Sequence, residues 1–237
     1  MRNQHTFGRQ CIGCFLLLKI CHPVSLYTRT PGLYTGHLMK AGMKTVTVYC
    51  GSSFGNKAEF REGAAALGHL QKKKKIHLVY GGGKVGLMGT VARAALEGGG
   101  QVTGIIPEAL KKKEVALEEC TELIVVDTMH ERKAKMAELS DGFIAMPGGL
   151  GTLEEVFEAV TWQQLGIHAK PCGLLNISDY YHGLLQFLDE AVANNFILQP
   201  HRDMLLVSED PAELLDRMNT FTAVHVDKAK WIRENMT

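Results

Sequence analysis

The sequence carries almost no net charge, and it contains no long hydrophobic run. Twenty-six lysine and arginine residues nearly balance 25 aspartate and glutamate residues, which leaves a formal net charge of +1. So small a net charge provides no global basic field, and we therefore expect no nucleic-acid partner. Since no stretch approaches the roughly 20 apolar residues of a membrane-spanning helix, we expect no membrane association either.

Cysteines are few, and their spacing indicates no disulfide framework. Cys50, Cys120 and Cys172 are far apart in the sequence, so a reducing cytoplasm is the expected compartment. Cys11 and Cys14 form a C-x-x-C pair, which could be half of a structural zinc site. No second pair with suitable spacing follows, so the sequence favours the absence of a metal site.

Short apolar segments alternate with amphipathic ones from residue 43 onward. The expected strands are 45–49, 76–80, 102–106, 123–126, 143–146, 171–175 and 204–207. Helical patterns separate them, and the longest begins at Thr152. This alternation predicts an α/β protein with a Rossmann-like, doubly wound parallel sheet and helices on both faces.

The same pattern suggests a single folded domain with two flanking segments. Residues 1–42 lack clear periodicity, and we interpret them as a weakly ordered N-terminal extension. Residues 43–222 form the expected Rossmann-like domain, and residues 223–237 a C-terminal tail.

Three glycine-rich loops follow three of the expected strands. They contain Gly51 after the first strand, residues 81–83 after the second, and residues 147–151 after the fifth. In a doubly wound sheet ligands bind at the carboxyl ends of the strands, so the three loops are expected to converge there. A glycine turn that opens a helix also presents free N–H groups to an anion. The alternative is that the glycines only form a tight turn, with Thr152 and Glu155 as a capping box.

Two familiar nucleotide signatures are missing from these loops. None of them matches G-x-G-x-x-G in the first strand–helix turn, and none matches G-x-x-x-x-G-K-[ST]. Their absence makes NAD and ATP less attractive ligands than a mononucleotide or a sugar phosphate.

Arg132 is the most informative charged residue. On a helix it shares a face with Met129 and Met136, which places a guanidinium on an apolar stripe. Such a group needs a carboxylate or a phosphate as its partner, so it forms either a structural salt bridge or a ligand clamp. Glu155 follows the third loop by one helical turn, and a carboxylate there is expected to act on a part of the ligand other than its phosphate.

Four segments together resemble the LONELY GUY family of cytokinin riboside 5'-monophosphate phosphoribohydrolases, and the similarity runs from about residue 44 to about residue 218. The segments are Cys50-Gly51-Ser52-Ser53, Tyr80-Gly81-Gly82-Gly83 with Gly86-Leu87-Met88-Gly89, Met129-His130-Glu131-Arg132-Lys133, and Pro147-Gly148-Gly149-Leu150-Gly151-Thr152-Leu153-Glu154-Glu155. Residues 1–42 fall outside the resemblance.

The resemblance implies hydrolysis of the N-glycosidic bond in a cytokinin riboside 5'-monophosphate or AMP, without a metal or an organic cofactor. It implies a homodimer, and Arg132 and Glu155 as the catalytic pair. It implies further substrate contacts at Glu114, Lys133, Gly149, Leu150, Gly151, Thr152, Leu153, Glu154 and Thr161. Cleavage of this bond passes through an oxocarbenium-like state, and a carboxylate at position 155 suits that chemistry.

Two other functions are compatible with the same residues. The glycine loops alone would equally serve a nucleotide-binding module without catalysis. A pyridoxal-phosphate decarboxylase would need a lysine that forms a Schiff base, and Lys84 or Lys133 would have to fill that role. The preference between AMP and N6-modified nucleotides does not follow from the sequence.

Overall fold

The computed structural model describes residues 42–114 and 116–224, without the side chains of residues 112–114. The expected N-terminal extension up to residue 41, including the Cys11–Cys14 pair, lies outside the described residues. So do residues 225–237 of the expected tail. The three-part division of the chain therefore stays a prediction.

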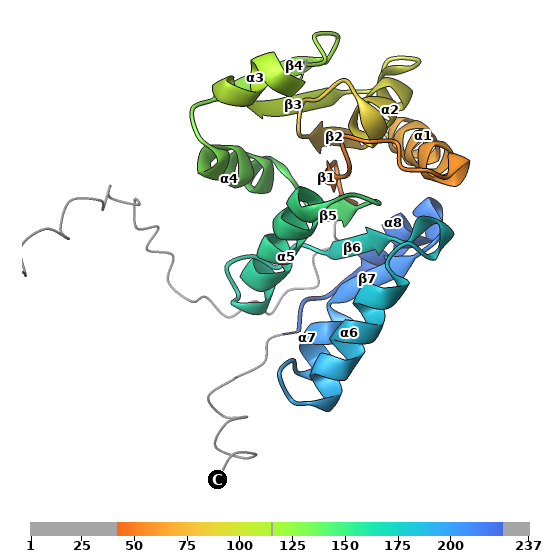
Figure 1. Ribbon diagram of the computed structural model, residues 1–237, viewed down its shortest axis with the longest axis vertical. Helices are drawn as coiled ribbons and strands as arrows, with labels where there is room; N and C mark the ends of the chain where they lie inside the picture. The colour runs from red at the N-terminus through yellow and green to blue at the C-terminus, as the bar shows by residue number, and fades with distance from the viewer. Residues whose placement is uncertain (1–41, 115, 225–237) are drawn as a thin grey trace, which may run out of the picture. The chain divides into compact units, whose positions relative to one another are not determined.

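The core of the protein is a seven-stranded parallel sheet (Figure 1). Its strands are β1 Thr45–Tyr49, β2 His77–Tyr80, β3 Val102–Pro107, β4 Glu122–Val126, β5 Gly142–Ala145, β6 Cys172–Leu175 and β7 Leu205–Ser208. The order across the sheet is β4-β3-β2-β1-β5-β6-β7. The chain thus builds outward from β1 in one direction and then returns to place β5 on its other side. The boundary between β1 and β5 is the topological switch point, where open α/β sheets bind their ligands.

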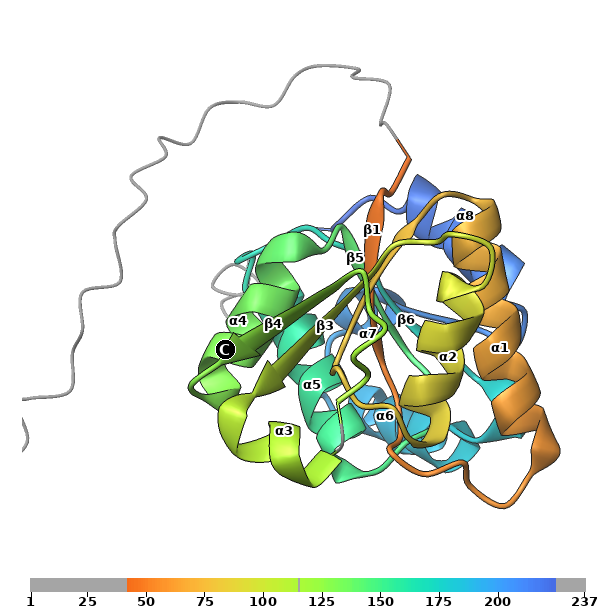
Figure 2. The ribbon, with the colours of Figure 1, turned by 90° about the horizontal axis from the view of Figure 1, so that it is seen from above.

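Helices cover both faces of the sheet, which confirms the predicted doubly wound class. The helices are α1 Ala58–Lys73, α2 Gly86–Leu96, α3 Glu108–Glu114, α4 Met129–Leu139, α5 Leu150–Gln164, α6 His182–Ala193, α7 Gln199–Asp203 and α8 Pro211–Thr220, with a short 3-10 turn η1 at Ile177–Asp179. Helices α1, α2 and α8 lie on one face, and α4 and α5 lie on the other (Figure 2). Among the described residues, no helix is both long and apolar enough to cross a membrane.

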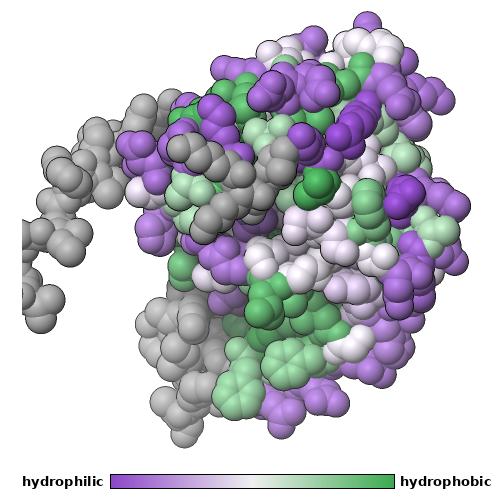
Figure 3. Space-filling view, turned by 45° about the horizontal axis from the view of Figure 1, so that its top comes forward, coloured by the Kyte–Doolittle hydropathy of each residue, from purple (hydrophilic) through white to green (hydrophobic). Residues whose placement is uncertain are grey.

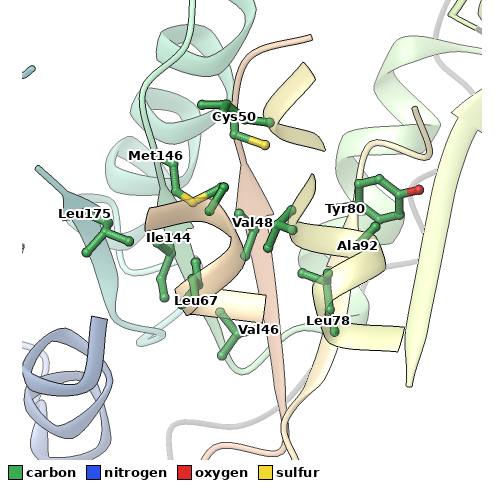
Figure 4. Close-up of a cluster of buried hydrophobic side chains, with 14 of the residues drawn as sticks. Val46, Val48, Cys50, Leu67, Leu78, Tyr80, Ala92, Ile144, Met146 and Leu175 are labelled. Atoms are coloured by element: carbon green, nitrogen blue, oxygen red, sulfur yellow. The ribbon is translucent and has the colours of Figure 1, made fainter. Parts of the chain in front are cut away.

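The two faces of the sheet support two separate apolar clusters, because side chains alternate along a strand. Val46 and Val48 of β1 point into the cluster beneath α1 and α2 (Figure 4). Tyr49 belongs to the opposite cluster, with Met136 of α4 and Val156 of α5. Each buried side chain of this size contributes about 1.5–3 kcal/mol to folding. The same alternation fixes which strand-end residues face the α4 and α5 side.

The start of α5 differs from the expectation. The helix begins at Leu150, and Gly149 is its N-cap residue, with no side-chain hydrogen bond to the helix end. The capping-box interpretation of Thr152 and Glu155 is therefore wrong, since both residues already lie inside the helix. Helix α8 has a side-chain cap at Asp210, whose carboxylate accepts hydrogen bonds from the N–H groups of Ala212 at 2.6 Å and Glu213 at 3.0 Å.

Candidate active site

The structure brings the three glycine loops together at the carboxyl ends of β1, β2 and β5. The Gly51 N–H, after β1, donates to the carbonyl of Pro147, after β5, at 3.0 Å. The Leu87 N–H, at the start of α2, donates to the carbonyl of Gly51 at 3.1 Å. Backbone hydrogen bonds therefore connect the loops directly, and the site is held by main chain at the switch point.

Close packing explains two of the glycines. A Cβ atom on Gly148 would lie 2.2 Å from Oγ1 of Thr152 and 2.9 Å from the Gly51 nitrogen. Gly86 has a φ of +62°, and a Cβ there would lie 2.2 Å from the backbone carbon of Ser52. Both positions exclude a side chain, so these glycines allow neighbouring loops to approach closely.

Gly149 and Gly151 are different, because nothing beyond their chain neighbours and the backbone of α5 itself lies within 4 Å of a Cβ at either position. Packing within the described chain therefore does not require glycine at these two positions. The absence of side chains leaves open space beside the first turn of α5, where helix N–H groups lack intrahelical partners. A helix N-terminus with open space beside it has the geometry of an anion site.

Arg132 lies at the edge of this space and is largely buried, with 8% of its side chain exposed. Its Nη2 atom lies 3.7 Å from Oε1 of Glu155 and 3.4 Å from the carbonyl oxygen of Gly81. A Cβ on Gly81 would lie only 2.1 Å from the same nitrogen, so glycine at this position makes room for the guanidinium. Met129 also contacts the group, with its sulfur 3.8 Å from Nη1.

The pairing of Arg132 with Glu155 leaves donor capacity on the guanidinium. A separation of 3.7 Å makes an ion pair but exceeds an ordinary hydrogen bond. The buried Nε of Arg132 has no hydrogen-bond partner within the described residues. A buried donor without a partner is costly, by about 1–3 kcal/mol, and a bound ligand oxygen would remove that cost.

Glu155 places a negative charge close to the end of β1. Burial, and then the charge of Glu155, raises the pKa of the Cys50 thiol above its ordinary value. The same two causes, in the same order, raise the pKa of the Tyr49 phenol well above its ordinary value. Both groups therefore stay protonated at neutral pH.

Lys133 follows Arg132 on α4 but faces different carboxylates. Its Nζ lies 2.5 Å from Oε1 of Glu154 and 3.0 Å from Oε1 of Glu158, and 10% of its side chain is exposed. The hydrogen bond with Glu154 is the main cause that raises the pKa of Lys133. Adjacent residues of α4 thus form parallel contacts to adjacent residues of α5, Arg132 to Glu155 and Lys133 to Glu154.

Other predicted contact residues are distributed unevenly around the loop. Thr152 is buried beneath it, Leu153 is half-buried, and Leu150 is 86% exposed at the start of α5. Thr161 is exposed farther along the helix, where its hydroxyl donates to the carbonyl of Phe157 at 2.6 Å. It lies six residues after Glu155, or about 9 Å along the helix axis. Glu114 ends α3, and its side chain lies outside the described part of the structure.

Two tyrosines at the site were not anticipated from the sequence. The Tyr180 phenol donates to the Gly148 carbonyl at 2.6 Å, and the Tyr181 phenol donates to the Met146 carbonyl at 2.6 Å. Both come from the segment between β6 and α6, about 30 residues beyond the loop in the chain. No local pattern marks them, because their role depends on how that segment packs against the loop.

A parallel doubly wound sheet with glycine loops and a helix N-terminus at its switch point defines an α/β protein of the Rossmann-like class. The solved molybdenum cofactor binding protein of Rippkaea orientalis has the same fold, with a TM-score of 0.55 and 23% identity. That match covers 76% of this chain and 96% of the other. At this level of identity it supports the fold alone.

Sequence comparison identifies the family. The family model described as "Possible lysine decarboxylase" matches residues 88–218. A rice (Oryza sativa subsp. japonica) protein named probable cytokinin riboside 5'-monophosphate phosphoribohydrolase is 48% identical over 80% of this chain and 83% of its own length. An Arabidopsis thaliana protein named cytokinin riboside 5'-monophosphate phosphoribohydrolase is 43% identical over 84% of this chain and 93% of its own. The chain therefore belongs to the LONELY GUY family.

Proposed function

We propose that the protein hydrolyses the N-glycosidic bond of cytokinin riboside 5'-monophosphates, of AMP, or of both. The products are the free base, an active cytokinin in the first case, and ribose 5-phosphate. The names of the relatives support this reaction. The structural observation that carries it is a carboxylate, Glu155, 3.7 Å from the buried guanidinium of Arg132 and one turn inside the helix that follows the glycine loop.

In this proposal the 5'-phosphate lies in the space beside residues 149–152. The N–H groups of this turn and the positive end of α5 favour an anion there. The helix end alone provides about 0.3–2 kcal/mol, so several N–H hydrogen bonds must share the task. The predicted contacts at Leu150, Leu153, Glu154, Lys133, Thr161 and Glu114 complete the set.

Glu155 and Arg132 act on the other end of the ribose phosphate. As the bond to the base breaks, positive charge develops on the ribose, and the Glu155 carboxylate stabilises it and orients the attacking water. Arg132 pairs with this carboxylate and offers its remaining donors to a substrate oxygen. A positioned group of this kind accelerates a reaction about 10²–10⁴-fold, which is about 3–5 kcal/mol of the barrier.

A homodimer is part of the proposal. Several large apolar side chains are exposed at the end of α5, along α6 and in the turn after it: Leu165 (64%), Ile167 (64%), Phe187 (63%) and Phe196 (87%). Figure 3 shows hydrophobic side chains gathered in the lower part of one face. Large exposed apolar patches mark interaction surfaces. Thr161 lies four residues before Leu165 on the same side of α5, so a second copy covering Leu165 would also approach Thr161.

The decarboxylase alternative fits Lys133 poorly. A Schiff base requires a neutral amine, whereas the hydrogen bond with Glu154 raises the pKa of Lys133 and keeps its ammonium charged.

The described cysteines, Cys50, Cys120 and Cys172, are free thiols, which supports the expectation of a reducing compartment, the cytoplasm.

The direct test is to incubate the pure protein with AMP and, separately, with isopentenyladenosine 5'-monophosphate, and to separate free base and ribose 5-phosphate by chromatography. Release of both products from either nucleotide is expected. Folded, dimeric protein that binds the nucleotides but releases no base would instead favour the non-catalytic binding module. Glu155→Ala separates the two functions, because an enzyme loses turnover and keeps nucleotide affinity.

A further inference from the structure

Four successive backbone carbonyls of the Pro-Gly-Gly loop, from Met146 to Gly149, each accept a hydrogen bond. The Tyr181 phenol donates to Met146 at 2.6 Å, and the Gly51 N–H donates to Pro147 at 3.0 Å. The Tyr180 phenol donates to Gly148 at 2.6 Å, and the Leu153 N–H donates to Gly149 at 3.1 Å. In a trans peptide the carbonyl and the following N–H point in opposite directions. Fixing the Gly148 carbonyl toward Tyr180 therefore directs the Gly149 N–H away from Tyr180.

This peptide needs an external restraint. Glycine on both sides of it permits backbone conformations that other residues avoid. Gly148 is closely packed against Thr152 and Gly51, whereas at Gly149 nothing lies within 4 Å of a Cβ position, so packing restrains the peptide on its Gly148 side only. If the peptide rotated, the Gly148 carbonyl oxygen would turn toward the anion space and repel a phosphate. The Tyr180 hydrogen bond opposes that rotation.

The segment that carries Tyr180 is itself held in an unusual conformation. Ser178 and Asp179, directly before it, have φ values of 56° and 55°, in the left-handed region that non-glycine residues seldom adopt. Asn176 stabilises this turn: its side-chain oxygen accepts the Tyr181 N–H at 2.7 Å, and its amide donates to Asp179 at 3.0 Å. Strained backbone persists only where its surroundings enforce it, and it concentrates at functional sites.

The two tyrosines differ in how deeply they are buried. Tyr181 is 2% exposed and belongs to the core. Tyr180 is 44% exposed and packs edge-to-face against Phe60 and Tyr181, with ring centroids 5.6 and 5.0 Å apart. The ring of Tyr180 is thus held by aromatic contacts, and its hydroxyl is committed to the Gly148 carbonyl.

We propose that Tyr180 is a positioning residue for phosphate binding. Its phenol holds the Gly148 carbonyl away from the anion space, so that the Gly149 N–H faces the 5'-phosphate of the substrate. The inference rests on the proposed function, because it assigns the phosphate to this loop. Tyr180 acts through the backbone and does not itself touch the phosphate.

Tyr180→Phe tests this, since it removes one oxygen and keeps the ring contacts. We expect the KM for AMP and the Kd for ribose 5-phosphate to rise about three- to tenfold, the range of one net hydrogen bond. Adenine inhibition and kcat are expected to stay within twofold. The matched control is Tyr80→Phe, whose phenol contacts the sulfur of Cys120 at 3.3 Å and not the loop; its phosphate affinity is expected to stay unchanged.

Calorimetric titration with ribose 5-phosphate keeps this inference separate from the proposed reaction. If the wild-type protein released no base, the proposed function would fail, while selectively weaker ribose 5-phosphate binding by Tyr180→Phe would still support the inference. Unchanged ribose 5-phosphate affinity in the variant would overturn it. Equal weakening of adenine and ribose 5-phosphate would also overturn it, because that result indicates general loosening of the site. A wild-type protein that binds no ribose 5-phosphate would overturn the inference as well.

Discussion

Glu155→Gln is the sharpest perturbation of the proposed chemistry. The change keeps the size of the side chain and removes its charge and basicity. The wild-type carboxylate is 11% exposed and lies beside a guanidinium that is 8% exposed, so little water is available to replace it. We expect kcat to fall about 10²–10⁴-fold, or about 3–5 kcal/mol of transition-state stabilisation, with KM changed less than about threefold.

The variant is expected to remain folded. Breaking a buried ion pair costs about 3–5 kcal/mol when the partners are closely hydrogen-bonded. The 3.7 Å separation and the retained amide oxygen place this case below about 3 kcal/mol.

Chromatographic base release measures turnover, and chemical denaturation measures stability. Glu138→Gln is the matched control, because Glu138 is exposed on α4 and pairs with Lys135 at 3.0 Å. A folded Glu155→Gln protein with turnover within tenfold of wild type would refute the assigned role.

Three further predictions follow from packing, protonation and the exposed surface. Gly81→Ala places a Cβ 2.1 Å from Nη2 of Arg132 and should lower turnover at least about tenfold by displacing the guanidinium, whereas Gly183→Ala, with no described atom within 4 Å, should leave turnover unchanged. Burial lowers the pKa of His168 to about 4, below its unfolded value of about 6.5, so its contribution to stability is complete above about pH 6.5 and is lost as the pH falls toward 4. Denaturation at pH 7 and pH 4.5 should therefore show a larger loss for wild type than for His168→Gln, and equal losses would contradict this. Phe187→Glu introduces a charge at a 63%-exposed apolar position and should shift sedimentation from dimer toward monomer, while an unchanged dimer would place the interface elsewhere.

The class of fold was predictable because each strand is short, apolar and separated from the next by a helical pattern. The alternation of Val46 and Val48 with Thr47 and Tyr49 also determines which side chains face which layer. The strand order was not readable, because it depends on contacts between segments distant in the chain. The short elements η1 and α7 were missed, since three and five residues are too few for a periodic signal.

The site was predictable where the sequence places a charged side chain on an apolar helix face. Arg132 on an apolar stripe required a partner, and the structure places Glu155 beside it. Tyr180 carried no such signal. The need for glycine at position 81 also had no signal in the sequence, because it arises only when the side chain of Arg132, 51 residues later, packs against it. The error at the start of α5 came from assigning the cap to the hydroxyl of Thr152, when Gly149 already occupies that place.

The central claim is that the glycine loop binds a 5'-phosphate while Glu155 promotes cleavage of the N-glycosidic bond. Comparing kcat/KM for AMP with that for adenosine under identical conditions tests both parts at once. Each charge-assisted hydrogen bond to the phosphate is worth about 1.5–3 kcal/mol, so two or more predict a preference for AMP of at least about 100-fold. Equal rates on AMP and adenosine, or no base released from either AMP or isopentenyladenosine 5'-monophosphate, would contradict the account.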